Sequence, residues 1–197
     1  MARTGRRPGP TSTRSTILEA ARRRFAAAGY SATSLRGIAA DACVDAGVVL
    51  HFFGSKEGLF RAAVGWPFDP ARAEQTLLSS SAEPLGTRLA QTFFEYWEDP
   101  TTGPALAALL RSAMTNVEAA ALLREFVAHE LFGRVAAQFA PDQTQLRVQL
   151  AAAQLVGIAV LRNLLQLEPI SSAPIENLVA WVGPNLERYR RSTEPDG

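Results

Sequence analysis

Side chains that could do chemistry are few in this sequence and stand far apart. One cysteine, Cys43, excludes an internal disulfide, and with only two histidines elsewhere it cannot build a standard zinc site. Carboxylates are scattered, apart from Glu95 with Glu98 and Asp99 beside an expected helix end. No nucleophile-elbow, phosphate-loop or dinucleotide-binding motif occurs. We therefore expect no enzyme, no metal ion and no cofactor.

Charge divides the chain more clearly than its net value of +1 suggests. Residues 1–61 hold ten basic and four acidic side chains, a balance of +6, whereas residues 62–197 hold ten basic and fifteen acidic ones, a balance of −5. A basic N-terminal third on an acidic remainder indicates that one part meets a polyanion such as nucleic acid. Chance clustering on a solvated surface explains the charge pattern alone equally well.

The elements that would position these charges are expected to be helices throughout, because no alternating strand pattern occurs. Residues 1–12 are expected to form a flexible basic arm, since they combine Gly and Pro with no apolar periodicity. One helix is predicted from Thr13 to a stop at Gly29, and another from a cap at Ser55. Residues 67–81 are expected to be a loop or a broken helix. Further helices are predicted over 85–98, 104–115, 118–139, 143–167 and 175–190, with Pro184 kinking the last one or splitting it after Val182.

Residues 34–53 have the pattern of two short helices joined by a tight turn. Thr33 can cap the first helix, Val44 would plug the turn into the core, and the second helix, over 46–52, would bury Val49. The residues of the second helix left facing outward, suited to close entry into the major groove of DNA, are Ala46, Gly47, Val48, Leu50 and His51. Ordinary helical bundles share this geometry, so the pattern alone leaves a role in DNA binding open.

Motifs around this segment resemble the N-terminal domain of the tetracycline-repressor (TetR) family. They run in order with unbroken spacing over about fifty residues: I-L-E-A-A, F-x-x-x-G-Y, T-S-L-R-x-I-A, the Gly47 position, the pair Phe52-Phe53 and S-K-E-x-L-F. The resemblance implies an all-α protein with a helix-turn-helix DNA-binding domain over 13–60 and a ligand-binding and dimerisation domain over 61–197. It would be a cytoplasmic, nucleoid-associated bacterial regulator, usually a repressor, that binds a palindromic double-stranded operator as a homodimer and leaves it when a small-molecule effector binds.

The resemblance also implies which side chains meet DNA. The reading helix maps to Asp45–Phe52, in which Asp45 is expected to cap the helix more than to read a base. The residues implied there are Asp45, Ala46, Gly47, Val48, Leu50, His51 and Phe52. Phosphate contacts map to Thr33, Arg36 and Lys56, the last at the start of the next helix. The basic arm would add Arg3, Arg6, Arg7 and Arg14.

Three positions depart from the family pattern. Cys43 replaces the glycine of the turn, which is costly if the backbone needs a positive φ there, and we expect it to be a small buried residue, with a redox role left open. Leu50 replaces a common tyrosine and Val48 a frequent threonine. The base-facing surface is therefore mostly apolar, with His51 as its main hydrogen-bond donor, and contacts to thymine methyl groups are expected to supply part of the specificity.

The second half carries two further sets of expected residues. An effector pocket, expected to suit an apolar or aromatic molecule, would involve Phe93, Phe94, Trp97, Met114, Asn116, Phe126, His129, Gln154 and Asn163. Broad apolar faces would form the dimer interface with Leu150, Ala153, Gly157, Leu161, Leu178, Trp181 and Val182. Each aromatic residue is equally explained as ordinary core. A helical interaction or architectural module without an effector is the alternative function. No membrane span is expected, because no apolar run approaches roughly 18 residues.

Overall fold

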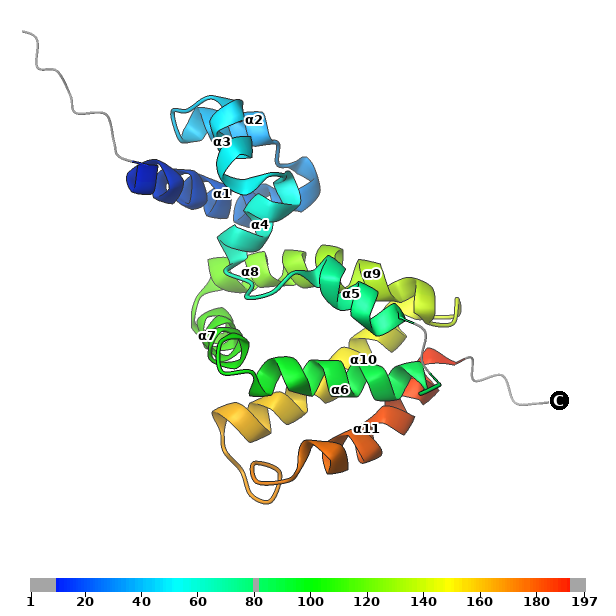
Figure 1. Cartoon of the computed structure of the whole chain (residues 1–197). Coiled ribbons are helices and arrows are strands. Elements are labelled where there is room, and N and C mark those ends of the chain that lie inside the picture. The colour runs from blue at the N-terminus through cyan, green and yellow to red at the C-terminus, as the bar shows by residue number, and fades with distance from the viewer. Residues whose placement is uncertain (1–9, 80–81, 192–197) are drawn as a thin grey trace, which may run out of the picture. The chain divides into compact units, whose positions relative to one another are not determined.

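Every regular element in the described residues, 10–79 and 82–191 of this computed structural model, is a helix, as expected (Figure 1). The chain forms two compact units. The N-terminal unit is Met1–Trp66 with Arg111–Phe126, and the C-terminal unit is Pro67–Leu110 with Val127–Gly197. This division differs from the boundary expected near residue 60, because a later helical segment packs with the first helices of the chain.

The N-terminal unit contains α1 (Pro10–Ala32), α2 (Leu35–Asp41), α3 (Ala46–Phe53), α4 (Lys56–Val64), the end of α7 (Thr102–Thr115) and α8 (Val117–Phe126). Gly29 interrupts α1 with φ 76° and ψ 172°, a conformation that essentially only glycine adopts. The stop predicted there is therefore a break in helical geometry inside α1. Just after it, the Tyr30 backbone N–H donates to the Glu125 carboxylate of α8 at 3.1 Å, which fixes the chain leaving the break.

Aromatic side chains fill the core of the N-terminal unit. Phe25 of α1, Phe60 of α4 and Phe126 of α8 are all 0% exposed, and the ring centroids lie 4.5 Å apart for Phe25–Phe60 and 5.6 Å apart for Phe60–Phe126. Ile38 of α2 and Val49 of α3 are also fully buried. Each of the two short helices is thus held by one large buried apolar side chain, and their remaining faces stay available.

The C-terminal unit contains the first part of α7 and eight further helical segments: α5 (Pro70–Leu78), α6 (Leu85–Glu98), η1 (Val127–Phe132), α9 (Gly133–Val135), η2 (Ala136–Gln138), α10 (Thr144–Ala159), η3 (Val160–Leu164) and α11 (Ile175–Arg190). α5 is a regular helix within the stretch expected to be a loop or a broken helix. Asp69 caps it by accepting a hydrogen bond from the Ala71 N–H at 3.1 Å, and Pro70 opens its first turn.

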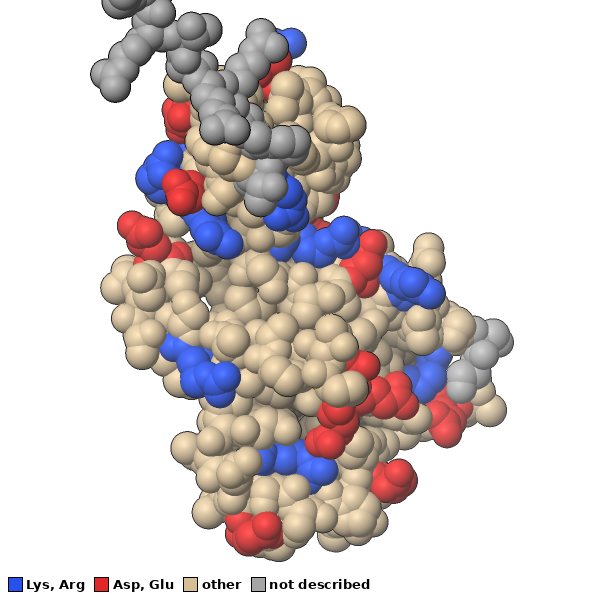
Figure 2. Space-filling model, turned by 60° about the vertical axis from the view of Figure 1, so that its left-hand side comes forward, with Lys and Arg blue, Asp and Glu red and all other residues tan. Residues whose placement is uncertain are grey.

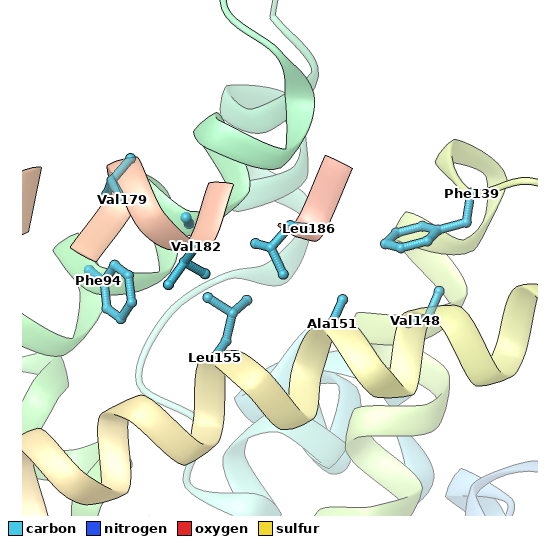
Figure 3. Packing of buried hydrophobic residues seen from close by; sticks show 9 residues of the cluster. Phe94, Phe139, Val148, Ala151, Leu155, Val179, Val182 and Leu186 are labelled. Carbon is cyan, nitrogen blue, oxygen red and sulfur yellow. The ribbon is translucent and has the colours of Figure 1, made fainter. Parts of the chain in front are cut away.

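The core of the C-terminal unit lies between α6, α10 and α11 (Figure 3). Phe94 of α6, Leu155 of α10, and Val182 and Leu186 of α11 meet there (Figure 3). α6 and α11 cross very closely at Gly86, where a Cβ atom would stand 2.5 Å from the backbone nitrogen of Glu187. This close approach requires glycine at position 86, and it brings the start of α6 against the last turns of α11.

Pro184 does not split α11. The helix runs from Ile175 to Arg190 through the proline, so the predicted end after Val182 is wrong. A proline removes one hydrogen bond and crowds the carbonyl four residues earlier, here that of the exposed Ala180, which solvent can hydrate. Val182 and Leu186, on either side of the proline, are both buried in the core with residues of α6 and α10.

Candidate nucleic-acid interface

The turn between α2 and α3 is a Schellman motif, the common way of ending a helix with one left-handed residue. The Val44 N–H donates to the Ala39 carbonyl at 2.9 Å, and the Cys43 N–H donates to the Ala40 carbonyl at 3.1 Å. Cys43 is the left-handed residue, with φ 53°, a position that glycine usually takes. Its side chain is exposed, so the expectation that Cys43 is buried is wrong. The Schellman geometry turns position 43 outward.

The exposed surface of α3 is formed mostly by short apolar side chains. Val49 is fully buried and anchors the helix, whereas Leu50 is 45% exposed and His51 is also exposed. Ala46 and Val48 are half-buried and Gly47 is exposed. Asp45 stands at the N-cap position, but its carboxylate makes no capping hydrogen bond, which contradicts the expected capping role and leaves that group exposed. Of the five residues predicted to face outward, Gly47, Leu50 and His51 are therefore exposed, and Ala46 and Val48 are partly so.

Lys56, the lysine predicted to bind phosphate, is held by an aromatic side chain. Its Nζ lies 4.3 Å from the ring centroid of Tyr30, a cation–π arrangement. The Tyr30 hydroxyl donates to the Glu57 Oε1 at 2.7 Å, and this hydrogen bond is the main cause that lowers the pKa of Glu57 below its ordinary value. Ser55 caps α4 by accepting from the Gly58 N–H at 3.0 Å. The ammonium group is thereby fixed at a helix N-terminus, where phosphate binds favourably.

Thr33 has a structural role in place of the predicted one. It is 3% exposed, and its hydroxyl faces the Gly29 and Arg24 carbonyls at 2.8 and 3.2 Å. The cap of α2 is the next residue, Ser34, which accepts from the Gly37 N–H at 3.1 Å. A phosphate contact through Thr33 does not fit this burial, because the hydroxyl is committed to the end of α1. The exposed hydroxyl at the start of α2 is that of Ser34.

Two of the arginines predicted to bind DNA, Arg14 and Arg36, lie in the described part of the chain. Arg14 is exposed on α1, and its guanidinium lies 5.2 Å from the ring centroid of Phe53 at the end of α3. Arg36 is exposed on α2. Arg3, Arg6 and Arg7 lie outside the described residues. On the face drawn in Figure 2, charged side chains stand in separate groups among uncharged residues, without one continuous basic field.

The residues predicted for an effector pocket are divided between the two units. Met114, Asn116 and Phe126 belong to the N-terminal unit, and the other six belong to the C-terminal unit. Phe126 is core, Met114 is 67% exposed, and the Asn116 side chain caps α8 by accepting from the Ala119 N–H at 2.9 Å. Phe126 is therefore part of the core of the N-terminal unit, whereas a place in an effector site stays a prediction for Met114 and Asn116.

The remaining predicted pocket residues lie in the C-terminal unit. Phe94 is 1% exposed in its core, and His129 is exposed. Phe93 packs beside Trp97, with ring centroids 6.0 Å apart. Gln154 and Asn163 each have a buried amide atom, Oε1 and Nδ2 respectively, with no hydrogen-bond partner among the described residues. Buried polar atoms are usually paired, so these two stand out as groups that could serve a ligand.

A hollow in the same unit is too small for an effector. It measures about 10 Å³, the space of about one water molecule. Its lining is mostly apolar and comes from α5, α6, α9, α11 and the segment just after α9, with Leu77, Leu89, Val135 and Phe139 among the residues.

α10 and α11 leave apolar side chains exposed. Leu146 is 50%, Leu150 43% and Trp181 80% exposed, and Ala153 and Gly157 are exposed as well. Leu161 and Leu178 are half-buried. Val182 is 4% exposed and points into the core toward Leu155, so it cannot belong to a dimer interface as predicted (Figure 3).

By length and composition alone, the stretch Thr144–Leu164 is apolar enough to cross a membrane, with a mean hydropathy of 1.3. The expectation of no such segment counted uninterrupted apolar residues, and this stretch includes Arg147 and Arg162. The Arg147 guanidinium is 11% exposed and donates to the Tyr189 and Arg191 carbonyls at 3.2 and 2.8 Å. These contacts join the first turn of the stretch to the end of α11, and 28% of its 18-residue apolar window is buried.

Two family models cover most of the chain. Residues 17–63 match the bacterial regulatory proteins of the tetR family, and residues 83–189 match the tetracyclin repressor-like C-terminal domain. A TetR-family regulator from Streptomyces coelicolor is 32% identical, covering 94% of this chain and 98% of that one, with a TM-score of 0.47. The multidrug binding protein EbrR, solved with proflavin, is 23% identical, covering 90% and 99%, with a TM-score of 0.48.

Among curated proteins, the transcriptional regulatory protein RaaS of Mycobacterium tuberculosis is 36% identical over 107 residues, which are 54% of this chain and 48% of that protein. The match thus spans about half the length of that relative. The N-terminal family model spans both α2 and α3, and the C-terminal one begins just before α6 and ends within α11. The chain therefore belongs to the TetR family of bacterial transcriptional regulators, which are DNA-binding proteins and not enzymes.

Proposed function

We propose that this protein is a dimeric repressor in the bacterial cytoplasm that binds a palindromic operator through α3 and leaves it when a small molecule binds. The observation that carries the proposal is the exposed face of α3, which follows a rigid Schellman turn and is flanked by Lys56, Arg36 and Arg14. Small outward residues suit entry into the major groove, and the cations suit the phosphates on either side.

Selection of duplexes from a random-sequence pool tests DNA binding directly. We expect enrichment of a sequence with two-fold symmetry, whose half-sites are separated by about one helical turn, about 34–36 Å. Affinity should fall steeply as salt rises, because phosphate contacts release counterions. Failure to enrich any duplex at low salt would contradict the proposal and favour the alternative of a helical interaction module.

A second copy of the chain is the proposed partner of the exposed apolar face on α10 and α11. Trp181 contributes the most apolar area to this face, because an 80% exposed tryptophan leaves a large apolar area in water. The small residues Ala153 and Gly157 allow another helix to approach α10 closely. A dimer would also double the reading surface, since one short helix contacts few bases.

The variant Trp181→Ser tests the dimer. Loss of a central tryptophan from an interface commonly costs about 2 kcal/mol or more, about thirtyfold in dissociation constant. Light scattering should show a dimer for the wild type at micromolar concentration and a shift toward monomer for the variant. Val117→Ser removes a side chain that is 86% exposed on α8, a helix of the N-terminal unit, and should leave the dimer intact. A monomeric wild type would refute the proposal.

An effector is expected in the C-terminal unit and is proposed to be apolar or aromatic with a polar group. The buried amide atoms of Gln154 and Asn163 support this, because a ligand could satisfy them. Compounds that release the selected duplex should bind more weakly to Gln154→Leu. Equal affinity for both proteins would exclude Gln154 from the effector site.

A further inference from the structure

We propose that operator DNA packs directly against the backbone of α3 at Gly47, and that this glycine is present for the DNA and not for the fold. The inference rests on the proposed DNA-binding function and adds a specific point of closest approach. It identifies a residue that sets how deeply the reading helix enters the groove.

The fold itself gives no reason for glycine at this position. Gly47 is the second residue of α3, and its backbone is not among the positive-φ glycines of the described chain. Among the described residues, no heavy atom lies within 4 Å of where its Cβ would stand. Alanine would therefore fit without strain, and it is the better helix former of the two.

The other described glycines show how unusual this is. Apart from Gly47, Gly133 and Gly157, each has a positive φ or has a heavy atom within 3.0 Å of its missing Cβ. Gly157 lies on the face proposed to meet a second copy. Gly133 lies at the start of α9, which belongs to neither proposed interface, and its Cβ would meet only the Ala128 carbonyl oxygen at an ordinary 3.8 Å.

The neighbours of Gly47 make a close approach feasible. Ala46 and Val48 on either side are half-buried, and no charged side chain stands between Asp45 and Lys56. The first turn of α3 is thus a shallow surface with its lowest point at Gly47. A base edge that reaches this point would touch the backbone, and any side chain there would push the helix out of the groove.

The variant Gly47→Ala tests this inference, with Gly133→Ala as the matched control. Both replace a helical glycine that has room for a methyl group, so both should raise Tm by about 1–3 °C. Only Gly47→Ala should weaken binding to the duplex selected by the wild type, by about tenfold to a hundredfold. Its affinity for a random-sequence duplex and its salt slope should stay unchanged, because no phosphate contact is removed.

The outcomes separate the inference from the function on which it rests. A Gly47→Ala protein that binds the selected duplex as tightly as the wild type would overturn the close approach while leaving DNA binding established. A lowered Tm for Gly47→Ala would overturn it as well, since the fold would then need the glycine. A wild type that selects no duplex would refute the proposed function and this inference together.

Discussion

Glu187 joins the end of α11 to the beginning of α6, and its ionisation should control stability at acid pH. Its Oε2 accepts from the Gly86 N–H at 3.0 Å, and its Oε1 accepts from Arg190 at 2.5 Å and from Arg191 at 3.0 Å. The carboxylate side chain is 12% exposed. The Arg190 hydrogen bonds, followed by those from Gly86 and Arg191, lower the pKa of Glu187 from 4.5 to about 2.

The sign and size of the effect follow from this pKa. A carboxyl group whose pKa is lower in the folded state stabilises the fold above its unfolded pKa, and the stabilisation is lost as pH falls through the folded pKa. A difference between 4.5 and about 2 corresponds to about 3 kcal/mol at pH 7. By the same linkage about 1 kcal/mol of it is left at pH 3. The loss therefore falls in the window from about pH 5 down to about pH 2.

Urea unfolding of the wild type and of Glu187→Gln, at pH 7 and pH 3 and at one protein concentration, measures this contribution. The variant keeps an oxygen acceptor for Gly86 but removes the charge. Its free energy of unfolding should lie about 3 kcal/mol below that of the wild type at pH 7 and about 1 kcal/mol below at pH 3. Glu118→Gln, which changes an exposed carboxylate at the start of α8, is the control and should show little change. An equal gap at both pH values would refute the reasoning.

Two further predictions concern the DNA-binding unit. Cys43→Gly should raise the free energy of unfolding by about 0.5–1 kcal/mol, or Tm by about 2–4 °C. The reason is that glycine adopts the left-handed conformation without strain, and this gain outweighs the extra freedom of the unfolded chain. Cys43→Ala keeps a Cβ atom, so a similar gain from it in a thermal melt would show that the backbone explanation is wrong. Lys56→Met should weaken binding to selected and random duplexes alike and reduce the salt slope by about one, measured by titration at several salt concentrations, and an unchanged slope would mean that Lys56 meets no phosphate.

Sequence patterns predicted the elements whose periodicity and end signals agree. The bounds 85–98 and 175–190 match α6 and α11, because a proline precedes each first turn and the apolar spacing is regular. α5 was missed although Asp69 and Pro70 give a start signal, because the short helix carries few apolar residues. The π-helical segments η1 and η3 have no recognisable sequence signal, since hydrogen-bond register there depends on packing.

The interface was predictable where spacing alone decides which way a side chain faces. Leu50 and His51 point outward because Val49 must point inward. Errors arose where the backbone leaves regular geometry. Cys43 is exposed because its backbone adopts the left-handed conformation, and Thr33 is buried because α1 continues past Gly29. The effector residues stay a prediction, because helical spacing does not tell which unit a helix joins, and these residues are divided between the two units.

The exposed Cys43 also provides a single site for attaching a label from which distances can be measured. It is the only cysteine in the sequence, and it stands in the turn directly before the reading helix. A spin label or fluorophore attached there needs no engineered site, and a dimer would carry one label beside each reading helix. The label-to-label distance would then report how far apart the two helices stand, with DNA bound and after release by an effector.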